Sequence, residues 1–204
     1  MRVESLSPNR GVSPLKNIMQ RTSILWRRLD RAGHEAARLT EHMTGPVVEG
    51  TVVFAERGQP CRLDYRLACD ADWRTLSANV TGWLGERAIA IDITADAERR
   101  WILGGAECAD VQGCDDVDLS FSPVTNMLPI RRMRLAIGER AVVRAAWLSF
   151  PACQLGPLEQ VYERVGDSTY RYESGDGAFM ATLHVNAAGL VTSYPGFWQR
   201  EEGC

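Results

Sequence analysis

From Ser23 onward the chain repeats one pattern, in which short alternating or apolar runs are separated by turns containing Gly, Pro, Asp or Asn. Residues 88–96, AIAIDITAD, alternate most strictly, and residues 61–70, CRLDYRLACD, place Leu63, Tyr65 and Leu67 on one face. A period of two residues is typical of a strand with one buried face, and short turns favour antiparallel neighbours. The pattern therefore predicts a mainly β chain of about 11–12 strands.

The first two runs, residues 23–30 and 34–43, are predicted to form a hairpin because only Arg31, Ala32 and Gly33 connect them. Propensity alone also allows a helix over 34–43. The further predicted strands cover 46–57, 61–70, 73–83, 88–96, 99–105, 141–151, 158–165, 169–174, 179–185 and 190–196. Residues 91–103 and 183–194 contain the same features in the same order. These are an alternating strand, an acidic or amide residue with Ala, a tight turn and a strand with an aromatic residue, and the shared order indicates an internal duplication.

Length and composition place the chain in the globular class. A chain of 204 residues, 45% of them hydrophobic, can bury a sizeable core, so we expect one curved β domain over 23–204 and a loose extension over 1–22. With 23 basic and 26 acidic residues, the chain has no broad positive field for nucleic acid.

No apolar run is long enough for a membrane-spanning helix, and the N-terminus lacks the apolar centre of a secretory signal. These features predict a cytoplasmic protein. The six cysteines are then expected to be reduced thiols, and without a CxxC pair they predict no zinc site. No cofactor is predicted.

The alternation is interrupted at Gly113–Arg134, where acids are followed by an apolar segment and then by bases. The spacing of Asp115, Asp116 and Asp118 is not that of a calcium loop. We expect these acids to lie in a solvated turn or to pair with Arg131 and Arg132.

Thr125 or Asn126 can begin a short helix or turn, and Pro129 limits its length. The apolar residues that would plug the concave face of the sheet are Met127, Leu128 and Ile130. Guanidinium groups at the mouth of an apolar cavity suit a phosphate, sulfate or carboxylate head. The arginines that would supply them are Arg131, Arg132 and Arg134, unless the aspartates neutralise them.

The chain has six tryptophans, and large rings with a polar tip suit both β cores and sugar-stacking faces. Most are expected in the core. Trp73 and Trp198, near segment ends beside polar residues, are predicted to line a cavity.

Catalytic motifs are scarce, with neither a GxSxG elbow nor a glycine-rich phosphate loop. Glu41 and His42 form a polar pair that could do acid–base work with the aspartates of 115–118, if all of them reached one substrate position. The alternative is a hydrogen-bonded pair at a strand edge.

Three blocks, DDVDLSFSPVTNMLPIRRMRL (115–135), AAWLSFP (145–151) and GLVTSYPGFWQR (189–200), resemble the bacterial family of putative glycolipid-binding proteins, formerly a domain of unknown function. The resemblance covers about residues 24–200. It implies a strongly curved antiparallel sheet, similar to the half-barrel lipid carriers of the bacterial envelope. Those carriers are exported, whereas this chain shows no export signal.

The leading hypothesis is a non-enzymatic binder of an amphipathic ligand, a glycolipid or fatty acid, in the concave face of the sheet. Its site would comprise Met127 and Leu128 beside the acyl chain, Arg131 and Arg132 at the polar head, and Trp73 or Trp198 against a sugar or chain. Each buried methylene would contribute about 0.8 kcal/mol. The alternatives are an enzyme using Glu41, His42 and the aspartates, and an interaction module that dimerises through a sheet edge.

Overall fold

The computed structural model describes residues 18–203, and a single antiparallel-rich sheet accounts for most of them. Its strands are β1 (Ile18–Arg28), β2 (Gly33–His42), β3 (Gly45–Glu56), β4 (Gln59–Cys69), β5 (Thr75–Leu84), β6 (Arg87–Ala95), β7 (Trp101–Leu103), β8 (Ala106–Glu107), β9 (Asp116–Leu119), β10 (Arg140–Ser149), β11 (Gln154–Gly166), β12 (Thr169–Ser174), β13 (Phe179–Val185), β14 (Val191–Tyr194) and β15 (Trp198–Arg200). The spatial order is β8-β7-β6-β5-β4-β3-β2-β1-β15-β14-β13-β12-β11-β10-β9. The predicted mainly β class with a curved sheet and a short central helix is confirmed.

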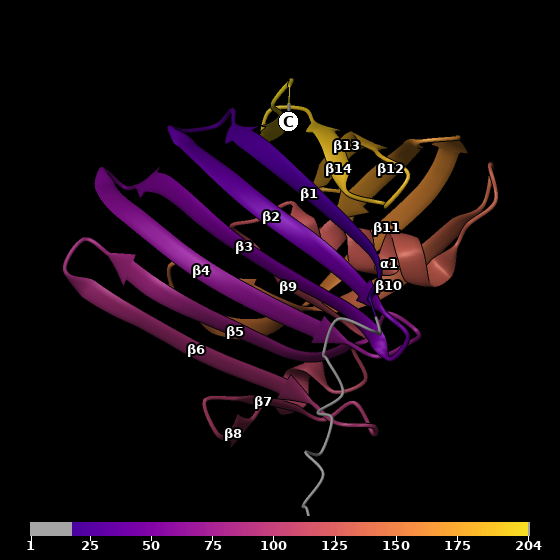
Figure 1. The fold of residues 1–204 in the computed structure, drawn as a ribbon. Coiled ribbons are helices and arrows are strands. Elements are labelled where there is room, and N and C mark those ends of the chain that lie inside the picture. Colours follow the sequence, from indigo (N-terminus) through magenta and orange to yellow (C-terminus); the bar gives the residue numbers. More distant parts are fainter. Residues whose placement is uncertain (1–17, 204) are drawn as a thin grey trace, which may run out of the picture.

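Two 3-10 turns, η2 (Ala109–Val111) and η3 (Val124–Asn126), and one helix, α1 (Met127–Met133), complete the described structure. Pro129 is tolerated because it lies in the first turn of α1, and Arg134 ends the helix in a left-handed conformation, with φ 50°. Figure 1 shows α1 between strands β1–β6 and strands β10–β14. Within residues 18–203, no helix has the length and hydropathy to cross a bilayer.

The sheet bends until its two ends approach each other, but it does not close. β9 pairs in parallel with β10. Beyond β9, the Thr75 amide donates to the Asp115 carbonyl at 3.0 Å, and the Val117 amide donates to Thr75 Oγ1 at 3.0 Å. Arg99 spans this seam, because its guanidinium donates to the carbonyls of Thr75, Cys114 and Asp115 at 2.7–3.0 Å. The Arg99 side chain therefore fastens β5 to the segment that leads into β9.

The concave face of the sheet is filled by the chain itself. Alternate residues of β1–β6 point inward and are buried, as the period of two predicts. They pack against the plug, which we define as residues 121–130. The apolar plug residues, each at most 5% exposed, are Phe121, Val124, Met127, Leu128 and Ile130. The hollow that the sequence suggested as an acyl site is therefore core.

A buried carboxyl group joins the plug to the sheet. Glu35 of β2 is 0% exposed, and its Oε1 accepts hydrogen bonds from Tyr65 Oη at 2.5 Å and from Ser122 Oγ at 2.6 Å. Gly50 of β3 makes this possible, since a Cβ there would lie 2.3 Å from the Tyr65 hydroxyl. Glycine lets the Tyr65 ring cross β3 and reach Glu35.

Three hairpin loops share one hydrogen-bond pattern. In each loop, the backbone N–H of the first residue donates to the carbonyl of the residue four positions later. The carbonyl of the first residue accepts from the backbone N–H of the residue three positions later, and that residue has a positive φ. The loops are Asp70–Arg74 with Trp73 at φ 69°, Asp96–Arg100 with Arg99 at φ 59°, and Asn186–Leu190 with Gly189 at φ 84°. The likeness of 91–103 and 183–194 thus reflects a loop type that also occurs a third time.

Several predicted boundaries were wrong. Within residues 18–203 the sheet has fifteen strands. The prediction of 11–12 strands missed β8, β9 and β15, because strands of two to four residues are too short to show a period. β1 begins at Ile18, inside the predicted extension, whereas residues 1–17 lie outside the described part. The hairpin of β1 with β2 is confirmed, which excludes the helical alternative for 34–43. Dimerisation through an edge stays a prediction.

Candidate functional site

A cleft of about 350 Å³ opens between the plug and strands β12–β15, and we call it the aromatic cleft. Its apolar walls come from Leu119, Pro123, Trp147, Leu158, Tyr172, Phe179, Tyr194, Phe197 and Trp198. Its polar lining comes from Arg28, Asp30, Arg31, Asp118, Ser120, Ser122, Asn126 and Ser174. Mostly apolar walls with a few polar groups are typical of small-molecule sites.

Four rings along one wall form the aromatic tetrad, Tyr172, Phe179, Tyr194 and Phe197. Their neighbouring centroids are 5.2–6.2 Å apart, with tilted or edge-to-face geometry. Tyr172 is buried, whereas Phe197 is 36% exposed at the rim. This spacing is within the favourable range for aromatic pairs, so the rings hold each other in place around the cleft.

Asp118 is the acidic group on the inner side of this cleft. Its Oδ2 accepts from Gln160 Nε2 at 2.5 Å, and Gln160 in turn is 2% exposed. Burial, together with the nearby charge of Asp116, raises the pKa of Asp118 to about 6, against the hydrogen bond from Gln160. Burial and the charge of Asp118 raise the pKa of Tyr172 as well. Asp118 and Tyr172 line the same cleft.

The two arginines of the aromatic cleft are already paired with acids. Arg28 donates to the two carboxylate oxygens of Asp30 at 3.0 and 3.1 Å. Its guanidinium carbon lies 4.7 Å from the Trp198 ring centroid and 4.8 Å from that of Phe54. Arg31 likewise donates to Asp30 at 2.8 Å and to Glu56. These contacts hold the Arg28 side chain in place, so that it forms part of the cleft wall against the Trp198 ring.

A second cleft, of about 480 Å³, lies at the C-terminal end of α1, and we call it the arginine cleft. Its lining residues are Ala71, Asp72, Trp73, Arg74, Arg131, Arg132 and Arg134. Arg131 donates to Glu41 Oε2 at 2.9 Å and to the Ala188 carbonyl at 3.3 Å, and its guanidinium carbon lies 4.3 Å from the Trp73 ring centroid. Arg131 is thus held from three sides.

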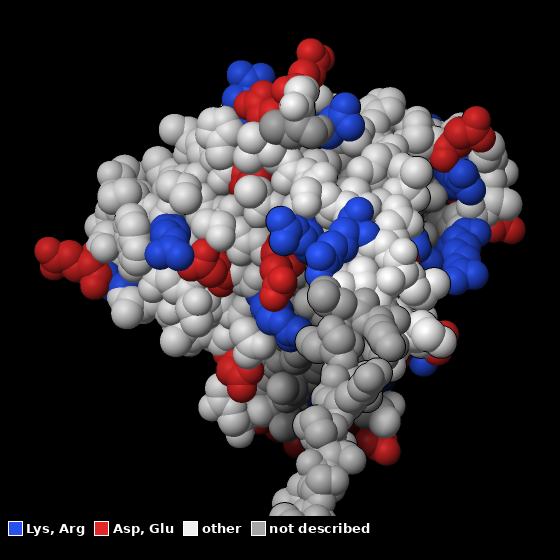
Figure 2. Space-filling view, in the orientation of Figure 1, with Lys and Arg blue, Asp and Glu red and all other residues white. Residues whose placement is uncertain are grey.

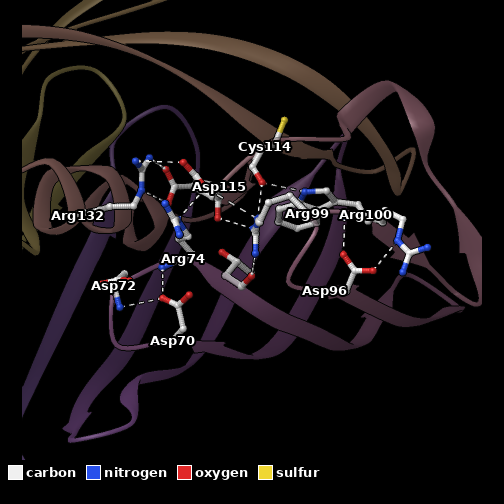
Figure 3. Close-up of polar contacts among 12 residues, drawn as sticks. Asp70, Asp72, Arg74, Asp96, Arg99, Arg100, Cys114, Asp115 and Arg132 are labelled. Atoms are coloured by element: carbon white, nitrogen blue, oxygen red, sulfur yellow. Dashed lines mark hydrogen bonds and ion pairs between the residues drawn. The ribbon is translucent and has the colours of Figure 1, made fainter.

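Arginines converge on Asp115 next to this cleft, as Figure 3 shows. Arg74 approaches Asp115 at 3.1 Å and Arg132 approaches it at 3.3 Å. Arg132 also pairs with Asp116 at 2.5 Å, and burial raises the pKa of that carboxyl group against the effect of Arg132. On the face drawn in Figure 2, basic and acidic side chains are likewise intermixed. The arginine cleft therefore offers few unpaired charges.

The structure divides the predicted site residues among three places. Arg131, Arg132 and Trp73 line the arginine cleft, and Trp198 lines the aromatic cleft. Met127 and Leu128 are 0% exposed in the core, so in this conformation no ligand can touch them. The two clefts share no lining residue.

The two predictions for the aspartates of 115–118 have different outcomes. The prediction of a solvated turn was wrong, since Asp116–Leu119 form β9 and Asp116 is 2% exposed. Pairing with an aspartate is confirmed for Arg132, whereas the partner of Arg131 is Glu41. Glu41 thus serves as a counterion, and nothing in the described geometry sets it against a substrate position beside His42.

Sequence reasoning missed the tetrad and Asp118 as cleft residues. A signal was present, because TYRYES alternates aromatic with polar residues and YPGFW places three aromatic residues around a turn. Strand pairing then places Tyr172, Phe179 and Tyr194 on neighbouring strands. Glu35 was missed too, because a carboxyl group in an alternating strand is normally assigned to the solvent face.

The fold and clefts define a class of protein, an open, strongly curved β half-barrel that carries a concave site beside an internal plug. The chain belongs to the family described as "Putative glycolipid-binding", whose model matches residues 23–200. No curated protein matches the chain.

Two solved structures share the fold. One, a DUF1089 family protein from Pseudomonas aeruginosa, is 32% identical with a TM-score of 0.72, over 98% of this chain and 100% of that one. The other, a β-barrel-like protein of domain of unknown function DUF1849 from Brucella abortus, is 10% identical with a TM-score of 0.50, over 88% and 93% of the two chains. The second likeness concerns the fold alone.

Proposed function

We propose that this protein binds an amphipathic ligand, such as a glycolipid or fatty acid, without catalysing a reaction on it. The observation that carries the proposal is the aromatic cleft, where aromatic walls surround Asp118, Asn126 and Ser122. Membership of a family named for glycolipid binding supports the same class of ligand. The apolar part of the ligand would lie against the tetrad, and its polar part would meet the inner polar groups.

The position of the ligand differs from the one that the sequence suggests. The plug fills the concave face, so an acyl chain could reach Met127 and Leu128 only by displacing buried residues. An anionic head could instead meet Arg131 and Arg132 beside Trp73. Because carboxylates already engage both guanidinium groups, we place the ligand in the aromatic cleft.

Native mass spectrometry of the protein purified from cells, followed by organic extraction, tests whether an amphipathic molecule is bound. The matched variants are Phe197→Ala, at the rim of the cleft, and Trp83→Ala, which is similarly exposed at 38% but does not line it. Loss of the co-purified molecule in Phe197→Ala alone supports the proposal. Absence of any bound molecule from the parent protein, with no binding of added octyl glucoside, rejects it.

A further inference from the structure

Asp118 differs from the other charged groups of the aromatic cleft in having no cationic partner among residues 18–203. Arg28 and Arg31 are neutralised by Asp30 and Glu56. Asp118, in contrast, receives only the neutral amide of Gln160, and the charge that acts on it is that of another acid, Asp116. An ionised carboxylate in such a site is costly unless a cation joins it.

The groups around Asp118 are aromatic. Tyr172 and Tyr194 line the cleft together with Asp118, and burial together with the charge of Asp118 raises the pKa of both hydroxyl groups. Both rings belong to the tetrad, and Trp147 lines the same cleft. Ring faces attract cations through their quadrupole, most strongly where water is excluded, and aromatic cages recognise quaternary ammonium groups in this way.

We propose that the aromatic cleft recognises an organic ammonium group, which would lie between the carboxylate of Asp118 and the aromatic tetrad. A neutral sugar could also stack on these rings, but it would leave the negative charge of Asp118 without a counterion. A phosphate or carboxylate would be repelled by that charge. The cleft volume of about 350 Å³ is sufficient for a trimethylammonium head and the first part of a chain. This inference rests on the proposed function: it keeps an amphipathic ligand in the aromatic cleft and narrows the class to ligands with an ammonium head, which excludes a fatty acid.

The test compares choline with its neutral isostere, 3,3-dimethylbutan-1-ol, because the two differ in charge and hardly in shape. Binding is followed by NMR, through the indole N–H signals of Trp147 and Trp198, with Trp83 as the internal control outside the cleft. We expect choline to bind at least ~10-fold more tightly than the alcohol. Asp118→Asn should abolish this preference, so that choline and the alcohol bind the variant with similar affinities.

A second variant keeps the test meaningful if Asp118→Asn fails to fold. Phe197→Leu removes one ring of the tetrad at an exposed rim position, and it should lower the preference for choline over the alcohol ~3-fold or more, because leucine keeps an apolar contact but has no ring face. Equal affinity of the parent protein for choline and the alcohol, or a choline preference that persists in Asp118→Asn, overturns the ammonium inference.

Octyl glucoside, a neutral amphiphile, separates this inference from the proposed function. If octyl glucoside binds and choline shows no advantage, the ammonium inference fails and the amphipathic proposal stands. If neither probe shifts the Trp147 and Trp198 signals, both fail.

Discussion

The aromatic cleft and the arginine cleft are lined from the two ends of the same short helical segment, yet their charges are arranged differently. At the C-terminal end, Arg131 and Arg132 are each matched by a carboxylate. Before the helix begins, Asp118 is left with an amide and rings. Removing one member of a buried ion pair leaves the other charge without a partner and destabilises the fold, whereas an unmatched charge in a cleft is available to a ligand. The difference agrees with a structural role for the arginine cleft and with the binding role proposed for the aromatic cleft.

The most severe test of this comparison is Arg132→Ala. The substitution leaves Asp116 buried without its partner, and breaking a buried pair in this way lowers the free energy of unfolding by about 3–5 kcal/mol. Urea denaturation measures the change. Arg134→Ala, on an exposed side chain of the same cleft, should change the value by less than about 0.5 kcal/mol. Similar small effects of both variants would contradict the structural role of the arginine cleft.

The carboxyl group beneath the aromatic cleft predicts a pH dependence. Burial raises the pKa of Glu35 from 4.5 to about 7, and its Oε2 has no hydrogen-bond partner among residues 18–203. Between those two values the folded protein binds more protons than the unfolded chain, so the free energy of unfolding falls as the pH rises. The contribution of Glu35 to the free energy of unfolding is fully present below about pH 4.5. It decreases by about 3 kcal/mol as the pH rises to about 7.

Glu35→Gln should remove this slope, so that the variant gains stability relative to the parent as the pH is raised. Urea denaturation at several pH values measures the difference. Glu98→Gln, on an exposed loop residue, is the matched control and should keep the slope. Parallel pH profiles for the parent and Glu35→Gln would show that Glu35 is not the titrating group.

Gly50→Ala tests the hydrogen bond from Tyr65 to Glu35, the carboxyl group that also holds Ser122 of the aromatic cleft. The added Cβ would lie 2.3 Å from the Tyr65 hydroxyl, so the ring must move away from Glu35 and with it from Ser122. We expect a loss of about 1–3 kcal/mol in the free energy of unfolding. Gly156→Ala, where a Cβ meets nothing within 4 Å, should have almost no effect. Equal effects would mean that the close approach at Gly50 is unimportant.

Much of the fold was predictable because most strands are long and one face of each is buried. Residues 61–70 and 88–96 alternate clearly, and they match β4 and β6. The central helix was predictable in position from Asn126 and Pro129, although the Asn126 side chain makes no capping hydrogen bond. The short strand β9 was not, because its acids suggested solvent and only pairing with β10 and Arg132 explains their burial.

The candidate site was less predictable than the fold. Sequence spacing brought Arg131 and Arg132 together with nearby Asp116, but the partner of Arg131 comes from β2, ninety positions away along the chain. Likewise the aromatic cleft combines β1 and β9 with strands β12–β15, which become neighbours only when the sheet is assembled. Local patterns contain no information on such contacts unless the strand order is known.

The smallest expected effect is also the one that decides between the two clefts. With octyl glucoside as the probe and tryptophan fluorescence as the readout, Phe197→Ala should weaken binding about 5-fold, because one ring contact contributes about 1 kcal/mol. Arg131→Ala should alter affinity less than about 2-fold, even though it releases Glu41 and uncovers Trp73. Trp83→Ala controls for the loss of a tryptophan signal elsewhere. The reverse order, with Arg131→Ala weakening binding and Phe197→Ala leaving it unchanged, would move the ligand to the arginine cleft, where its head would have to compete with Glu41 for the same guanidinium group.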